Sequence, residues 1–193
     1  MEKFSKLPTV EGAVSLYNVL ADGTWNKLSE ESNQIQWSWG QIACHLFGDG
    51  NSAYKISAMY IEFENTAFTP SVPSYSRDEG VEYYEGLSLS ATRDFIRVPL
   101  LATPSKTLAS GYSNIAFNQL NFIAQTSGVQ GVHGKTFSDT VSSKVFGLAL
   151  VAAPAWNDRT KDLIFARKYY SSGSMVTKQA SSQIGVSWAE RFK

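Results

Sequence analysis

The stretch Tyr54–Asn65 constrains the fold of this chain more than any other part of the sequence. Its second half alternates strictly, and a period of two places one set of side chains on a buried face and the other on a wet face of a strand. The two sets are Met59, Ile61 and Phe63, and Tyr60, Glu62 and Glu64. In the first half the large apolar residues have the opposite parity. The switch near Ala58 predicts either a β-bulge or a strand buried on both faces for half of its length.

Other segments with the spacing of strands recur along the chain. They are 34–39, 93–101, 115–124, 145–151, 163–170 and 183–188. Residues 10–20 fit either a short helix or a strand, and no long stretch has the 3.6-residue period of a helix. Short strands separated by turn signals are typical of a β-sandwich or jelly roll. We therefore predict an all-β fold, an antiparallel, jelly-roll-like β-sandwich with long loops.

Two strand segments carry more specific predictions. Residues 145–151 alternate large with small side chains, which predicts a buried strand with another backbone packed closely on its small face. Pro99 lacks a hydrogen-bond donor, and we therefore expect it at an edge or at the end of a strand.

The length of 193 residues predicts one domain, 1–193, large enough to bury a core without a disulfide. Residues 1–33 are the least decided part and can form an N-terminal arm. Residues 66–89 are rich in Pro, Ser and Tyr, and loops of this length in a compact domain are usually functional or part of an interface. The candidate interface residues are Tyr75, Arg77, Tyr83 and Tyr84.

The charge of the chain bears on its partners. Seventeen basic residues balance seventeen acidic ones, whereas a protein that grips a phosphate backbone usually carries a positive excess. We therefore expect no nucleic-acid partner. No apolar run is long enough to span a bilayer, so we expect no membrane partner either. Near-zero net charge also lowers the barrier to self-association, which favours a homo-oligomer.

Cys44 is the only cysteine, so no intrachain disulfide can form. The N-terminus lacks the apolar region of a secretory signal, and these features together predict a protein made in a reducing cytoplasm. His45 stands beside Cys44, but the only other histidine is His133, so a zinc site lacks ligands. We expect Cys44 to be a small core residue and the protein to hold no metal or cofactor.

Three further motifs have a functional and a structural interpretation. Glu62 and Glu64 could be the acid and base of a glycosidase, but the alternation alone explains them as a solvated strand face. The sequence 49–51, Asp-Gly-Asn, resembles part of a calcium loop but lacks the later acidic ligands, so we expect a turn. The glycine-rich run 128–134 lacks the Lys-Ser/Thr ending of a phosphate loop and reads as a mobile connection. We expect no catalytic residue.

The five tryptophans could line a sugar-binding platform or fill the core. They are Trp25, Trp37, Trp39, Trp156 and Trp188. Three of the five lie on alternating strand positions, where a place in the core is favoured.

Three segments resemble stretches of tailed-bacteriophage virion proteins, the small structural proteins encoded in the morphogenesis region. They are 60–65 (Tyr-Ile-Glu-Phe-Glu-Asn), 93–100 (Arg-Asp-Phe-Ile-Arg-Val-Pro-Leu) and 180–188 (Ala-Ser-Ser-Gln-Ile-Gly-Val-Ser-Trp). The resemblance covers the middle and the C-terminal third of the chain, and its motifs are strand-forming rather than catalytic. It implies a capsid decoration, neck, tail or fibre-attachment protein, often a β-sandwich, located in the virion.

These observations lead us to expect a non-enzymatic virion structural protein that acts by symmetric assembly. Its partners would be its own copies and the capsid, portal or tail proteins. The alternative is a carbohydrate- or receptor-binding module of a tail fibre, which would expose indoles in a shallow groove. A third hypothesis is a hydrolase that uses Glu62 and Glu64.

Overall fold

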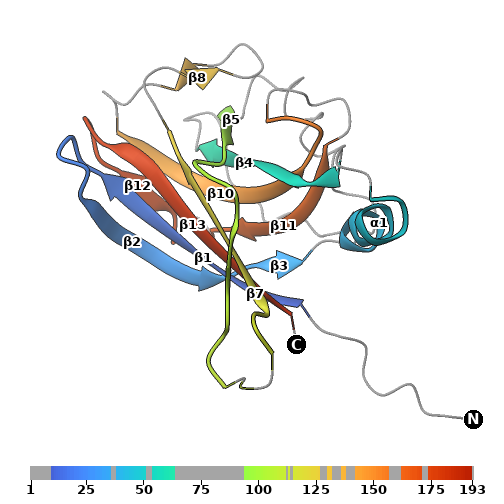
Figure 1. Ribbon diagram of the computed structural model, residues 1–193. Coiled ribbons are helices and arrows are strands. Elements are labelled where there is room, and N and C mark those ends of the chain that lie inside the picture. The colour runs from blue at the N-terminus through green and yellow to red at the C-terminus, as the bar shows by residue number, and fades with distance from the viewer. Residues whose placement is uncertain are drawn as a thin grey trace, which may run out of the picture.

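The structure of the protein is a computed structural model, shown in Figure 1. The residues it describes are 10–35, 38–50, 54–63, 94–111, 113, 115–126, 130–131, 136–137, 142–156, 162–170 and 174–192. Most of the described residues lie in strands, and these form two antiparallel sheets packed against each other. The predicted all-β sandwich is therefore confirmed.

The first sheet, sheet A, has five strands with β2 and β6 at its edges. In spatial order they are β2 (Trp25–Ser32), β1 (Val10–Val19), β13 (Gln183–Phe192), β7 (Gln119–Gln125) and β6 (Ser105–Thr107). β1 pairs with β13 along its whole length, from Val10 opposite Phe192 to Val19 opposite Gln183. Residues 10–32 are therefore strands of the sandwich rather than an arm.

The second sheet, sheet B, has six strands. In spatial order they are β3 (Gln34–Ile35), β11 (Leu163–Tyr169), β10 (Ser143–Ala152), β4 (Ile56–Phe63) and β5 (Asp94–Pro99), with β12 (Val176–Lys178) also paired to β10. Two short strands, β8 (Gln130–Gly131) and β9 (Thr136–Phe137), pair separately. Pro99 ends the edge strand β5, as its missing donor predicts.

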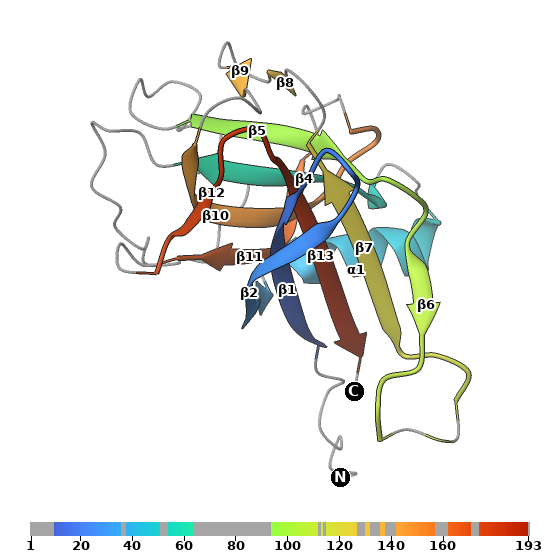
Figure 2. The same cartoon turned by 90° about the vertical axis from the view of Figure 1, so that its left-hand side faces the viewer.

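One apolar cluster fills the space between the sheets. Sheet A contributes Val14, Leu16, Phe122, Val186 and Trp188, and sheet B contributes Met59, Ile61, Leu148, Leu150 and Phe165. Trp188 is among the largest fully buried side chains, so it is a core residue, as its alternating position predicts. Figure 2 shows the strands of sheet A running across those of sheet B, so that side chains from both layers meet in this cluster.

β4 explains the switch of parity in the stretch 54–65. Its register against β10 shifts between Ala58 and Ile56, which leaves Ser57 as an extra residue, and β4 is buried on both faces beyond that point. Both features that the switch predicts are therefore present. On β10, Gly147 makes room for side chains rather than for a backbone, because a Cβ there would lie 3.1 Å from the ring of Tyr169.

The prediction of a strand over residues 34–39 is wrong at its end. β3 stops at Ile35, and a helix, α1 (Ser38–Cys44), continues into one π-helical turn, η1 (His45–Asp49). Trp39, Ile42 and Leu46 have helical spacing, and all three pack on the core cluster. The ring of Trp39 lies edge-on to Phe165 at 5.2 Å. This short apolar stripe competes with the period-two pattern and prevails because its side chains pack on the core cluster.

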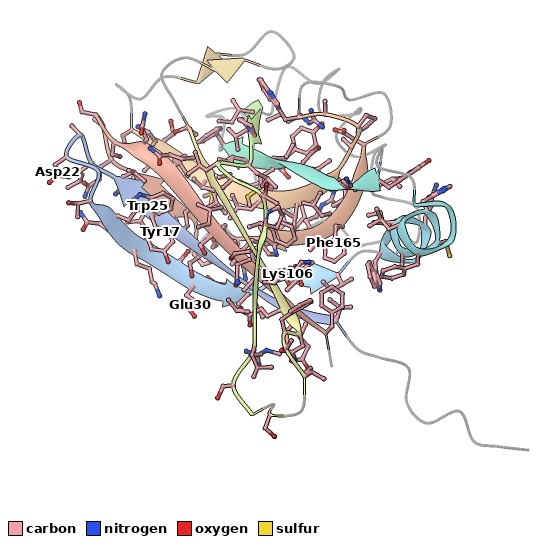
Figure 3. All side chains as sticks on the ribbon, viewed as in Figure 1. Tyr17, Asp22, Trp25, Glu30, Lys106 and Phe165 are labelled. Atoms are coloured by element: carbon pink, nitrogen blue, oxygen red, sulfur yellow. The ribbon has the colours of Figure 1, made fainter. Side chains whose placement is uncertain are left out.

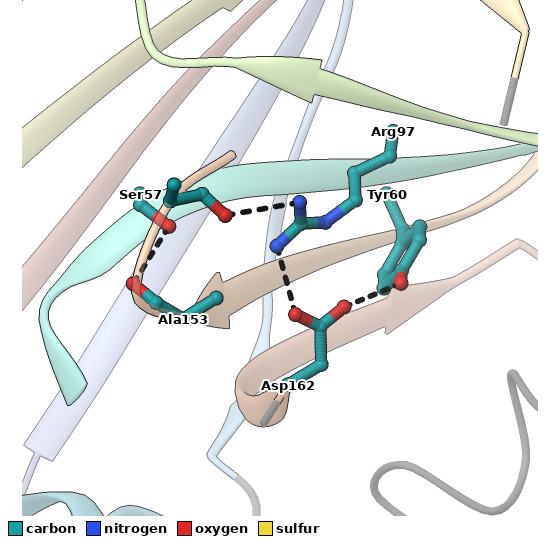
Figure 4. A network of polar contacts seen from close by, with 6 residues as sticks. Ser57, Tyr60, Arg97, Ala153 and Asp162 are labelled. Atoms are coloured by element: carbon teal, nitrogen blue, oxygen red, sulfur yellow. Dashed lines mark hydrogen bonds and ion pairs between the residues drawn. The ribbon is translucent and has the colours of Figure 1, made fainter. Parts of the chain in front are cut away.

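A buried polar network fastens the segment that follows β10 to sheet B (Figure 4). Arg97 on β5 donates to the carboxylate of Asp162 at 2.8 Å, and the Tyr60 hydroxyl donates to the same carboxylate at 2.5 Å. Arg97 also donates to the carbonyl of Ala155 at 3.2 Å. All three side chains are almost completely buried, so each depends on the others to replace the water it has lost.

Replacing Asp162 with alanine therefore should destabilise the fold strongly. The change leaves the Arg97 charge buried without its carboxylate, which costs about 3–5 kcal/mol. Urea unfolding followed by tryptophan fluorescence measures the loss. Lys27→Ala breaks an exposed ion pair with Glu30 and is the matched control, expected to unfold like the wild type. Equal stability of the two variants would contradict the role given to the network.

Candidate functional site

The residues expected to form an interface lie in a part of the chain that the structure does not describe. Tyr75, Arg77, Tyr83 and Tyr84 all fall in the gap between residues 63 and 94. Their role therefore stays a prediction, and any interaction surface must be sought among the described residues.

The carboxylates expected on a solvated strand face are not arranged that way. Glu62 is 1% exposed, and its carboxylate lies beside Gly147 and Tyr169 on the face of sheet B that points away from the core cluster. The expectation of a solvated Glu62 is therefore wrong, because β4 is buried on both faces. Glu64 lies outside the described residues. A hydrolase that uses this pair would need Glu62 to be reached by substrate.

The predicted place of Cys44 in the core is also wrong. Cys44 ends α1 and is exposed, whereas its neighbour His45 stacks on Tyr54 with ring centroids 4.0 Å apart. In the part of the chain that the structure describes, no three metal-ligating side chains come together. Gly50 has a φ of 61° at the end of η1, as a turn there requires. Of the glycine-rich run 128–134, only Gln130–Gly131 is described, as β8.

The tryptophans divide between core and surface. Trp188 is in the core and Trp39 packs against it, whereas Trp156 is 42% exposed and Trp25 is half-buried on β2. Trp37 lies outside the described residues. Two indoles are therefore available to a ligand or partner.

The clearest interaction surface is a row of exposed apolar side chains along β6, β7 and the segments around them. We call Leu101, Leu108, Ile115, Phe117 and Ile123 the hairpin patch. Each is 42–55% exposed although each is large and apolar. Figures 1 and 2 show the connection between β6 and β7 projecting from one end of the sandwich. Leu108, Ile115 and Phe117 belong to this connection, whereas Leu101 and Ile123 lie side by side farther along β7. Exposed apolar patches mark interaction sites in soluble proteins.

Asn118 holds the base of this projection in place. Its side-chain oxygen accepts from the backbone N–H of Ala109 at 2.8 Å, and its amide group donates to the carbonyl of Phe192 at 3.1 Å. Its backbone also pairs with Thr107 and Phe192. Asn118 is 7% exposed, so these bonds are shielded from water. The loop that carries Ile115 and Phe117 is thus anchored at its base.

The edge of sheet A beside the patch is not suited to strand addition. β6 has only three residues, all exposed, and its central residue is Lys106. The Lys106 ammonium lies 5.0 Å from the centre of the Phe117 ring. Short edges that carry a lysine discourage pairing with a foreign strand. A partner would therefore contact the side chains of the patch rather than extend the sheet.

The spacing of residues 115–124 predicts one strand, and for this reason the patch is not evident from the sequence. The strand β7 begins only at Gln119, so Ile115 and Phe117 lie in the loop. Large apolar residues among the turn-forming residues of 109–118 were the available signal, since nothing in a loop of this composition needs them for a core.

Glu190, on the core side of β13, is an acid whose pKa is strongly perturbed. Burial raises the pKa of its carboxyl to about 7, although hydrogen bonds from Trp188 and Asn33 oppose the rise. The Trp188 indole donates at 2.6 Å, and a Cβ on Gly12 would overlap the Glu190 carboxylate. A pKa near 7 suits acid–base catalysis, but the Glu190 side chain is fully buried and no substrate can reach it. We assign it a structural role.

Replacing Asn118 with alanine should loosen the projecting loop and destabilise the protein by about 1–3 kcal/mol, because buried backbone groups of Ala109 and Phe192 lose their partner. Thermal unfolding and amide hydrogen exchange of residues 107–119 measure the two effects. Asn121→Ala is the matched control, since its amide bonds Thr107 and Ser105 at the surface. Unchanged exchange in the Asn118 variant would contradict the anchoring role.

The Glu190 carboxyl makes the stability depend on pH. In the folded protein its pKa is about 7, above the ordinary value of 4.5 for such a carboxyl, so the unfolded chain loses this proton at a lower pH. As the pH rises from 4.5 to 7, the free energy of unfolding therefore falls, and this group accounts for about 3 kcal/mol of the decrease. Glu190→Gln should match the wild type near pH 4 and exceed its stability above pH 7.

Urea unfolding of both proteins across this pH range gives the difference directly. The exposed Glu11→Gln variant is the control, for which the difference from wild type should not grow with pH in this way. A constant difference between wild type and Glu190→Gln would show that the carboxyl ionises normally in the folded state.

No helix among the described residues is long and apolar enough to cross a membrane. The chain matches no protein family, and no curated protein or solved structure is similar enough to count as a match. Its function must therefore be inferred from the side chains described above.

Proposed function

We propose that this protein is a non-enzymatic structural protein that works by assembly with copies of itself through the hairpin patch. The observation that carries the proposal is the exposure of Leu108, Ile115 and Phe117 on one anchored projection, with Leu101 and Ile123 exposed farther along sheet A. Exposed apolar patches mark interaction sites, and an interface core is built from residues of this type.

The energy available from the patch suits a symmetric contact. Ile115 and Phe117 are 48% and 50% exposed, so covering them removes about half of their side-chain surface from water. Complete burial of such a side chain contributes about 1.5–3 kcal/mol. Covering only the exposed half therefore contributes about 1 kcal/mol for each residue. In a two-fold contact each residue occurs twice, and the four side chains together contribute about 4 kcal/mol, or about a thousandfold in Kd.

A second copy is the partner that the charges favour. Seventeen basic and seventeen acidic residues leave no net charge, so copies do not repel one another at a distance. Within the patch Lys106 is the one cation described beside Phe117, and its aliphatic stem can be buried while its ammonium stays at the rim.

The setting we propose is the virion of a tailed bacteriophage. Its support is the resemblance of segments 60–65, 93–100 and 180–188 to virion proteins, together with the β-sandwich in which these segments are strands or lead into them. Capsid, portal or tail proteins would then be further partners. Burial of Glu62 favours this assignment over a hydrolase. Capsid and portal genes beside the gene of this protein would support the setting, and their absence would count against it.

The double variant Ile115→Ser with Phe117→Ser should weaken self-association by about a thousandfold, because it removes the centre of the contact. Light scattering over a dilution series measures the mass in solution. Phe47→Ser is the matched control, since Phe47 is 80% exposed but lies in η1, away from the patch.

A monomeric wild type, or a double variant that assembles as well as the control, would overturn the proposed contact. Tyr83→Ala with Tyr84→Ala, measured in the same way, tests the surface predicted for residues 66–89. Loss of assembly in that variant alone would move the interface to those residues and contradict the role of the hairpin patch.

A further inference from the structure

A groove of about 400 Å³ lies on sheet A at the end opposite to the projecting loop. The turn between β1 and β2, the end of β7 and the start of β13 form its walls, and the residues that matter for a ligand are Trp25, Gln125, Ser181 and Gln183. Its volume falls within the range of small-molecule sites in proteins. Nothing in the assembly proposed above uses it.

Trp25 is fixed as one wall of the groove. Its six-membered ring lies over Gly185, where a Cβ would overlap it, and Tyr17 meets it edge-on at 5.2 Å. Figure 3 shows Tyr17 and Trp25 side by side near Asp22, at the turn between β1 and β2. Gly185 on one side and Tyr17 at the edge hold the indole, so a ligand meets a preformed apolar plate that need not move.

Two amides face this plate across the groove. Gln125 donates its side-chain N–H to the side-chain oxygen of Gln183. This bond orients both amides and leaves the oxygen of Gln125 and the amide hydrogens of Gln183 to a ligand. The groove thus offers an acceptor and a donor side by side, next to the hydroxyl of Ser181.

The lining also defines the charge of the ligand. Among the residues that the structure describes, none that lines the groove is ionisable. The nearby Asp22 carboxylate accepts from the backbone N–H of Thr24 at 2.8 Å, which holds it in the turn. A charged ligand would find no counter-ion on the described walls, so the groove suits a neutral one.

We propose that this groove binds a neutral sugar of a glycan. The apolar face of a pyranose ring, with its C–H bonds, packs on an indole plate, and its neighbouring hydroxyls both donate and accept hydrogen bonds. An indole, an oriented pair of amides and an uncharged lining match these needs together. The site is separate from Ile115 and Phe117 of the hairpin patch, because Gln125 is at one end of β7 and the projecting loop that carries them is at the other. Ile123 of the patch lies two residues from Gln125 on the same strand.

The test uses the full-length protein and a panel of neutral sugars. The probes are glucose, galactose, mannose, N-acetylglucosamine and the disaccharides lactose, maltose and cellobiose. Saturation-transfer NMR detects binding, and titration of tryptophan fluorescence gives Kd. We expect at least one sugar to bind saturably.

The variant Gln125→Leu with Gln183→Leu keeps the bulk of the walls and should weaken binding about tenfold or more, because two hydrogen bonds are lost. Gln119→Leu lies on the same strand and the same face, away from the groove, and should bind like the wild type. Trp25→Ala should abolish binding. The glutamine variants keep the test decisive if that variant fails to fold.

Absence of binding by every sugar in the panel would overturn the inference, as would binding that the glutamine variants leave unchanged. The same samples separate this site from the assembly proposal. The variant Ile115→Ser with Phe117→Ser should bind a monosaccharide as the wild type does, and Gln125→Leu with Gln183→Leu should assemble as the wild type does.

Discussion

The fold rests on one apolar contact between two sheets whose strands cross. Trp188 and Val186 from sheet A meet Leu148 and Leu150 from sheet B in a single cluster. Because β13 and β10 are central strands, this contact fixes both layers at once and leaves their outer faces and edges to other tasks. The projecting loop and the Trp25 groove lie at opposite ends of sheet A. Hydrogen bonds of Asn118 hold the loop, and packing on Gly185 and Tyr17 holds Trp25, so neither surface needs a ligand to keep its shape.

Several polar side chains are buried in the sandwich. The Asp162 carboxylate compensates the charge of Arg97, and the Tyr60 hydroxyl donates a further hydrogen bond to the same carboxylate. The environment of Glu190 is different. Its hydrogen-bond donors, Trp188 and Asn33, are neutral and do not compensate for the water that its carboxylate has lost. The ion pair compensates the loss of water in the first arrangement, whereas burial raises the pKa of the Glu190 carboxyl to about 7 in the second.

Periodicity predicted the class of fold because burial on one face of a strand leaves a direct trace in the sequence. It failed where the register shifts. β11 has a bulge near Phe165, so that Phe165 faces the core cluster while Tyr169, of the same parity, lies on the opposite face beside Gly147. The prediction for residues 34–47 failed for another reason. The period of a strand and the period of a helix overlap there, and only the tertiary packing of Ile42 decides between them.

The functional surfaces were harder to predict than the core. The hairpin patch depends on where β7 begins, and strand boundaries are the least certain part of a sequence-based prediction. The groove depends on Gly185, whose missing side chain lets Trp25 lie on the sheet from a strand two places away. Such contacts join residues more than a hundred positions apart, and no local pattern encodes them.

The passage of the chain from one sheet to the other has a mechanical consequence. β5 belongs to sheet B, yet Leu100 bridges to Ala124 and Leu101 bonds Ile123 on β7, so the chain that carries Arg97 bends directly from sheet B into sheet A. This junction ties the edge strand of sheet B to the strand that leads into the projecting loop. A load applied to the loop is therefore shared between the two sheets rather than borne by sheet A alone.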